Sequence, residues 1–88
     1  MLRLTRTTRL PHEVVLRVEG QMVAEWVGLL EGECLEILGS DRKVLLDLAD
    51  VSFLDHRAAR MLRRMAQGQV SLINCSPLVE ELLAEDVG

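Results

Sequence analysis

The sequence predicts an α/β domain in which a mostly parallel four-stranded sheet, with an antiparallel N-terminal edge strand, packs against three helices in the order ββαβαβα. The chain has 88 residues, which suits a single domain spanning residues 1–88. Its hydrophobic fraction of 49% is almost wholly aliphatic, as a packed core requires. After the second strand, strand patterns alternate with helix patterns, and this alternation implies parallel strands joined by right-handed crossovers.

The first two elements are expected to be strands that form a hairpin. Residues 2–9 alternate leucines with arginines and threonines, which is typical of an edge strand protected by charge, and Pro11 ends this strand. Residues 13–19 ("EVVLRVE") follow the same two-residue period, and Gly20 closes the second strand. The inward positions of that strand are Val14, Leu16 and Val18.

The first helix and the third strand follow. Residues 22–38 repeat apolar side chains every three or four positions, as an amphipathic helix does, and Gly39 ends the helix. Residues 43–54 ("KVLLDLADVSFL") are a nearly continuous apolar run, which is typical of a central parallel strand buried on both faces. The apolar face of the helix comprises Val23, Trp26, Val27, Leu30, Cys34, Ile37 and Leu38.

The last three elements are a helix, a strand and a helix. Residues 57–67 have a helical period, with four arginines opposite the apolar residues, and Gly68 ends this helix. Residues 69–75 ("QVSLINC") predict the fourth strand. In the final helix, which Ser76 caps, Pro77 takes the first helical position.

Charge and hydropathy argue against two classes of partner. The net charge of −4 disfavours nucleic acid, because binding to a phosphate backbone depends on clustered cations. No apolar run approaches the roughly 20 residues that span a bilayer, so direct membrane insertion is not expected. Cys34 and Cys75 lack a CxxC spacing, and arginines interrupt the N-terminal apolar residues, which leaves no signal-peptide pattern. We therefore expect reduced core cysteines in a cytoplasmic protein.

The sequence does not predict an enzyme. His12 and His56 have no serine or cysteine partner in sequence that would make a nucleophile and base pair. Isolated histidines and cysteines offer no metal-ligand spacing, and no glycine-rich phosphate loop is present, so we expect neither a metal nor a cofactor. Asp47 and Asp50 flank the end of the third strand, where turn and cap roles are favoured over that of a phosphate acceptor.

Charged residues gather at the start of the second helix, in the stretch "VSFLDHRAARML" at 51–62. Asp55 precedes the helix and can accept hydrogen bonds from its first free N–H groups. The arginines at spacings of three, six and seven share one exposed sector, which is either a solvated face or a docking surface for an acidic partner. These arginines are Arg57, Arg60, Arg63 and Arg64.

The chain resembles the STAS domain family, which includes anti-sigma factor antagonists and the cytoplasmic tails of sulfate transporters. The resemblance rests on "VVLRVEG", "KVLLDLADVSFLD" and "VSLINCSPLVEELL", and it covers nearly the whole chain. It implies a STAS-like version of the predicted α/β fold. Fold is implied more strongly than role.

In this family the turn after the third strand typically reads Asp-Ser-Ser-Gly-Leu, and a partner kinase phosphorylates the second serine. Asp55 matches the family's acid, and Arg57 occupies the phosphoserine position. The resemblance therefore implies a module without serine phosphoregulation, in which a fixed positive charge replaces a removable phosphate. The full matching stretch is Asp55, His56, Arg57, Ala58 and Ala59.

These implications predict a small non-enzymatic regulatory module of signalling or transcription control, which binds an anti-sigma factor or a kinase-like protein. The partner-binding residues would be Asp55, His56, Arg57, Arg60 and Arg64. One alternative is an accessory subunit of an ABC-type transporter. A second is a module that binds a small ligand, a nucleotide or a lipid, at the helix N-terminus after Leu54. A homodimer also stays open.

Overall fold

The computed structural model describes residues 2–23 and 25–85, without the side chains of Arg9 and Glu85. One four-stranded sheet has the strand order β1-β2-β3-β4, in which β1 is antiparallel to β2 and the other neighbours are parallel. This arrangement confirms the predicted fold class. The elements are β1 Leu2–Leu10, β2 Glu13–Met22, α1 Glu25–Leu38, β3 Lys43–Leu54, α2 His56–Met65, β4 Val70–Ile73 and α3 Pro77–Glu85.

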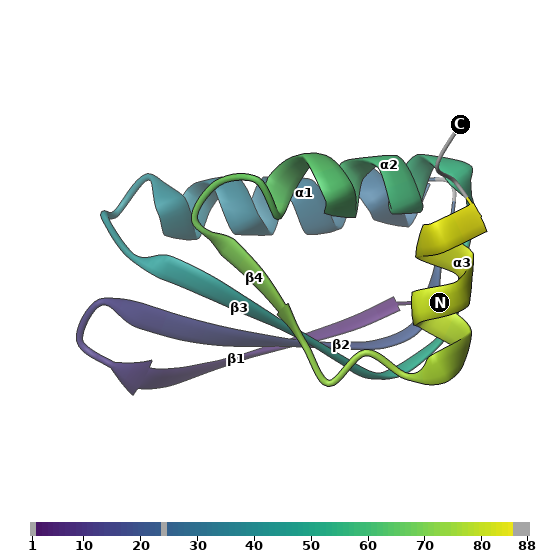
Figure 1. Ribbon diagram of the computed structural model, residues 1–88. Helices are drawn as coiled ribbons and strands as arrows, with labels where there is room; N and C mark the ends of the chain where they lie inside the picture. The colour runs from purple at the N-terminus through teal and green to yellow at the C-terminus, as the bar shows by residue number, and fades with distance from the viewer. Residues whose placement is uncertain (1, 24, 86–88) are drawn as a thin grey trace.

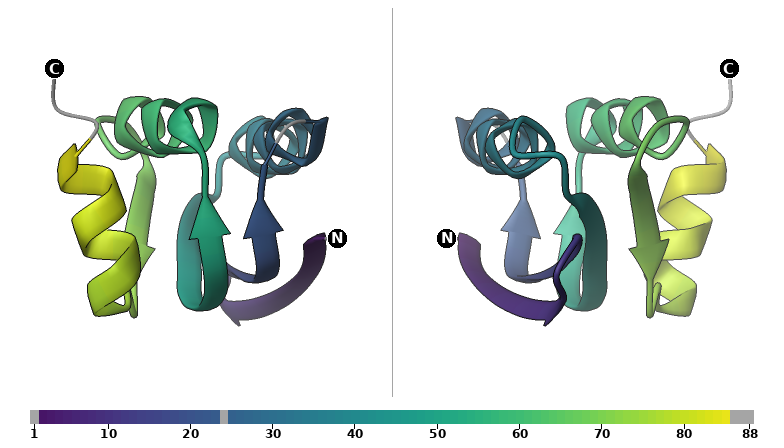
Figure 2. Two further views of the ribbon diagram at one scale, coloured as in Figure 1. Left: turned by 90° about the vertical axis from the view of Figure 1, so that its right-hand side faces the viewer. Right: turned by 90° about the vertical axis from the view of Figure 1, so that its left-hand side faces the viewer.

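The helices occupy two positions relative to the sheet. Helices α1 and α2 lie side by side over one face, and α3 lies at the side where β4 is (Figures 1 and 2). Strand β4 pairs with β3 from Val44 to Asp47, so among the described residues no strand pairs with the second half of β3 on that side. Helix α3 contacts this longer strand and inserts Val79 into the core.

The core lies between the sheet and the two covering helices. In the first half of β2 and of β3, alternate residues point into it, as a two-residue period requires, and the alternation ends where the register between the two strands shifts. The prediction that β3 is buried on both faces is wrong, because α1 and α2 cover only one face and Leu45 stays half-buried on the other. The fully buried larger side chains are Val14, Leu16, Val18, Met22, Leu30, Cys34, Ile37, Val44, Leu46, Leu48, Leu62 and Val79.

The ends of several elements differ from the prediction. Strand β2 continues past Gly20, which adopts a φ of 107° beside a register shift instead of ending the strand. Met22 pairs in register with Leu54 and is fully buried, so it belongs to β2, and α1 begins at Glu25. Strand β4 stops before Asn74, whose left-handed φ of 56° departs from extended backbone. Helix α2 covers His56–Met65, one residue earlier at its start and two residues shorter at its end than predicted.

Candidate functional site

The start of α2 is held by Asp55 at the exit of β3. Asp55 has extended backbone angles, and its Oδ1 accepts a hydrogen bond of 2.9 Å from the backbone N–H of Ala58. The Asp55 backbone N–H donates to the Met22 carbonyl oxygen at 3.1 Å, which ties the start of α2 to the end of β2. The N-cap role predicted for Asp55 is therefore present. The ends of β2 and β3 together fix the position of the first turn of α2.

Helix α2 separates its apolar and cationic residues by face. Arg57, Arg60 and Arg64 are exposed, whereas Arg63 is half-buried. The prediction that all four arginines share one exposed sector is thus wrong for Arg63. The buried residues of the helix are Ala58, Ala59, Met61, Leu62 and Met65.

A groove of about 590 Å³ runs between α1 and α2. Four of the five predicted partner-binding residues line it from the α2 side, and Asp55 does not, because its carboxylate turns toward the helix N-terminus. We call this feature the α1/α2 groove. Its lining residues are Glu25, Val27, Gly28 and Glu31 from α1, and His56, Arg57, Arg60, Met61 and Arg64 from α2.

The charges of the α1/α2 groove are arranged on opposite walls. Three arginines stand on the α2 wall and two glutamates on the α1 wall. Arg64 forms an ion pair with Glu31 across the groove, and 66% of the Arg64 side chain and 34% of the Glu31 side chain remain exposed. Arg57 forms no ion pair with any side chain that the structure describes. Its side chain is exposed and lines the groove.

Sequence reasoning missed the α1 wall. The helical pattern places Glu25 outside the apolar face of the first helix and assigns no role to Gly28 or Glu31. Their spacing of three residues places them on one side of α1, but the sequence does not indicate which neighbour that side faces. Only the packing of α1 beside α2 brings the two walls together.

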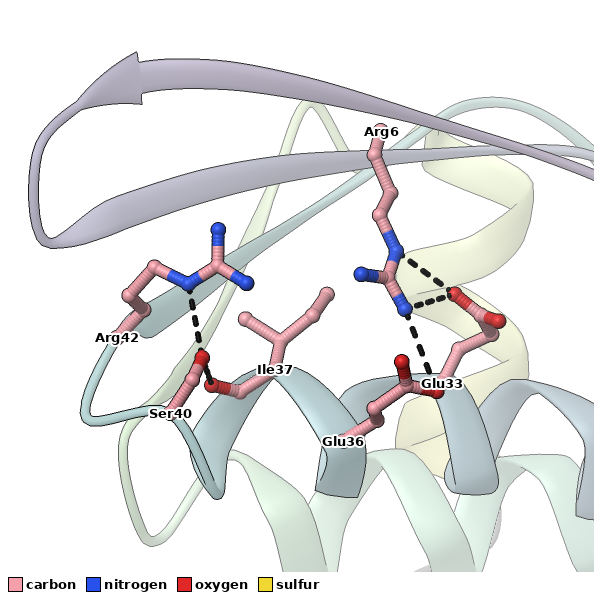
Figure 3. Close-up of polar contacts among 6 residues, drawn as sticks. All are labelled: Arg6, Glu33, Glu36, Ile37, Ser40 and Arg42. Atoms are coloured by element: carbon pink, nitrogen blue, oxygen red, sulfur yellow. Dashed lines mark hydrogen bonds and ion pairs between the residues drawn. The ribbon is translucent and has the colours of Figure 1, made fainter.

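A second polar cluster joins β1 to α1 and lies outside the groove (Figure 3). The Nη2 atom of Arg6 lies 2.6 Å from Oε2 of Glu33, and Glu36 lies nearby at 3.7 Å. The hydrogen bond to Glu33 is the main cause that raises the pKa of Arg6. Near the end of α1, the Ser40 hydroxyl donates to the Ile37 carbonyl oxygen and accepts from Nε of Arg42. The Arg6 contacts hold β1 against α1, and the Ser40 contacts are local to the turn between α1 and β3.

The candidates for phosphate acceptance are engaged in local contacts. Nε of Arg17 donates to Asp50 at 3.0 Å, and this hydrogen bond is the main cause that raises the pKa of Arg17. Asp47 accepts from the backbone N–H of Ala49 at 3.1 Å. Asp47 and Asp50 lie inside β3, beside a register shift in its pairing with β2, so the prediction that they flank the end of this strand is wrong. His12 is exposed in the turn between β1 and β2.

The cysteines are free and have raised pKa values. Burial raises the pKa of the Cys34 thiol to about 11, and it also raises that of the half-buried Cys75. Across the described ranges 2–23 and 25–85, no three histidine, cysteine or acidic side chains gather as metal ligands would. Within the same ranges, no helix has the length and apolar content needed to cross a membrane.

Comparison with known proteins places this geometry in a family context. A model of the STAS domain matches residues 4–85. No match is found among curated proteins. Among solved structures, the chain is similar to the unphosphorylated anti-sigma factor antagonist SpoIIAA, with a TM-score of 0.69 and 19% identity over 93% of this chain and 82% of that chain.

Two further structures have the same fold. The phosphorylated form of the Bacillus cell fate determinant SpoIIAA matches with a TM-score of 0.64 and 16% identity, over 97% of this chain and 84% of that chain. A protein from Shewanella loihica with a SpoIIAA-like fold matches with a TM-score of 0.60 and 14% identity, over 91% and 71% of the two chains. At these identities the likeness is one of fold.

Proposed function

This chain belongs to the STAS domain family, and from that premise we propose that it is a small non-enzymatic, cytoplasmic module that docks a regulatory protein without being switched by serine phosphorylation. Its fold is that of SpoIIAA, an anti-sigma factor antagonist. The proposed partner is an anti-sigma factor or a kinase-like protein. The docking residues are Asp55, His56, Arg57, Arg60 and Arg64.

The exposure of Arg57 carries this proposal. The side chain stands in the first turn of α2, lines the α1/α2 groove and is not folded onto a carboxylate that the structure describes. It occupies the position at which the family's turn has its second serine, so the surface keeps one positive charge where a phosphate would add about two negative charges. A guanidinium that is exposed beside a groove suits recognition of a carboxylate on a partner.

Binding to purified kinase-like anti-sigma factors tests the proposal. Arg57→Glu reverses the charge at the groove, and we expect it to weaken the complex by about tenfold or more, as loss of an interface arginine does. Arg3→Glu makes the same charge change on β1, where Arg3 is exposed and pairs in register with Glu19. Isothermal calorimetry gives both affinities, and circular dichroism verifies that both variants are folded.

Two results would contradict the proposal. Equal affinities of Arg57→Glu and the wild type would remove this surface as the docking site. If Arg3→Glu lowers the affinity as much as Arg57→Glu does, the complex responds to net charge alone, because both variants make the chain's net charge more negative than −4.

A further inference from the structure

We propose that the α1/α2 groove receives one acidic α-helix of the partner protein, and that Glu31 is an internal competitor that holds Arg64 until a carboxylate of the partner replaces it. The inference rests on the proposed docking function and names the chemistry of its partner. It also assigns a role to a residue of α1, outside the predicted partner-binding set.

The two walls of the groove run in the same direction. Strands β2 and β3 are parallel, and α1 follows β2 as α2 follows β3. Both helices therefore run antiparallel to these two strands and parallel to each other (Figure 1). The ion pair between Glu31 and Arg64 shows that these two positions lie opposite each other across the groove. Arg57, Arg60 and Arg64 span about 10 Å along α2 at 1.5 Å per residue.

This spacing fits a helical ligand. Side chains at positions i, i+3 and i+7 of an α-helix lie on one face over the same length as these arginines, so glutamates at those positions can meet them in turn. An acidic helix therefore complements the α2 wall in both charge and spacing.

The α1 wall leaves room for that helix. Gly28 is exposed, and a Cβ built on it would meet no atom within 4 Å. Val27 and Met61 are almost fully buried beneath the opening and give the groove an apolar floor. A partner backbone can thus approach α1 closely at Gly28 while its acidic side faces α2.

The acids of the α1 wall disfavour a compact multivalent anion. Glu25 and Glu31 line the same groove, and they repel a phosphate cluster with its dense charge more than they repel carboxylates aligned along the opposite wall. A protein helix is the occupant that these charges favour.

Glu31 competes with the partner for Arg64. Both side chains of this ion pair keep contact with water, and exposed pairs of this kind are weak. A carboxylate of the partner can therefore replace Glu31 at little cost. Because the free protein already satisfies Arg64, we expect Glu31→Gln to bind the acidic helix about two- to five-fold more tightly than the wild type.

The test uses a synthetic amphipathic peptide of about 16 residues, long enough to form helix, with glutamates at positions i, i+3 and i+7. A control peptide has glutamine at the same positions. Each is titrated into the isotope-labelled full chain at low salt, and amide chemical shifts give the site and the affinity. Glu33→Gln is the matched control variant, because Glu33 pairs with Arg6 on another side of α1.

We expect the glutamate peptide to bind more tightly than the glutamine peptide, to shift amides of both groove walls, and to gain affinity with Glu31→Gln but not with Glu33→Gln. Equal affinity of the two peptides, shifts outside the groove, or no effect of Glu31→Gln would overturn the inference. Tighter binding of inositol hexakisphosphate or of phosphatidylserine vesicles than of the glutamate peptide, with an affinity that Glu31→Gln increases, would also overturn the inference. If the peptide fails while Arg57→Glu still weakens the native complex, the docking function stands without the acidic helix.

Discussion

Asp55 and Arg57 place opposite charges within one turn of α2. The N-terminus of a helix favours negative charge, so Arg57 stands in an electrostatically unfavourable position there. The Asp55 carboxylate offsets this, because it accepts a hydrogen bond from the backbone N–H of Ala58 at 2.9 Å. The turn thus tolerates an exposed cation that the helix alone would disfavour.

Replacing the cap tests this reasoning. We expect Asp55→Ala to lower the free energy of unfolding by about 1 kcal/mol, since it removes the side-chain acceptor for the N–H of Ala58. Asp55→Asn keeps an acceptor oxygen and should lose much less. Urea denaturation followed by the fluorescence of Trp26 gives both values. Equal midpoints for Asp55→Ala and the wild type would show that the hydrogen bond does not stabilise α2.

At the scale of elements, the lengths of β3 and β4 determine where α3 packs. Strand β3 has 12 residues and β4 has four, and the two pair only over Val44 to Asp47. The free half of β3 would expose an unpaired edge, which in many proteins invites pairing with another chain. Helix α3 contacts β3 and is seated by Val79. The helix therefore acts as the cover that a longer β4 would otherwise provide.

Two neighbouring positions on α3 separate packing from exposure. Val79 is fully buried, whereas Leu78 is 46% exposed. We expect Val79→Ala to destabilise the fold by about 1–3 kcal/mol, through lost apolar burial and the cavity left behind. Leu78→Ala should stay within about 0.5 kcal/mol of the wild type. Chemical denaturation measures both, and similar losses for the two variants would mean that α3 is not seated through Val79.

For the molecule as a whole, the order of helices and strands could be predicted from the sequence, whereas the residues at which they begin and end could be predicted less well. The period of two in β2 and the helical period of α1 are local properties of the chain, and both elements occur in the structure. Met22 belongs to a strand because it pairs with Leu54, a residue of another element. Such distant pairing overrides a local helical period, and a single sequence contains no direct record of it.

The candidate site divides in the same way. Arg57, Arg60 and Arg64 could be placed on one face because they lie on one helix, and they line one groove. Arg63 is half-buried because helix α2 has neighbours on more than one side, which its own periodicity does not include. Glu31 escaped prediction because its importance comes from an ion pair with Arg64 on a different helix.

The buried thiol of Cys34 links the stability of the whole molecule to pH. Burial raises its pKa from an ordinary value of 9.0 to about 11. Between these values the unfolded chain has lost the thiol proton and the folded chain has kept it, so the unfolded state binds fewer protons. The stabilising contribution is complete below about pH 9 and is lost as the pH rises toward 11. Burial raises the pKa of Cys75 as well, which acts in the same direction.

We therefore expect the free energy of unfolding to fall between about pH 9 and about pH 11, with the loss from Cys34 reaching about 2–3 kcal/mol once the folded thiol has also ionised. Denaturation in the presence of a reductant, repeated at several pH values, measures the slope. Cys34→Ala should be less stable at neutral pH because it leaves a small cavity, yet its stability should fall less steeply in alkali. Parallel slopes for the variant and the wild type would show that Cys34 ionises equally in the folded and unfolded chains. The pH response would then have to come from groups outside the core.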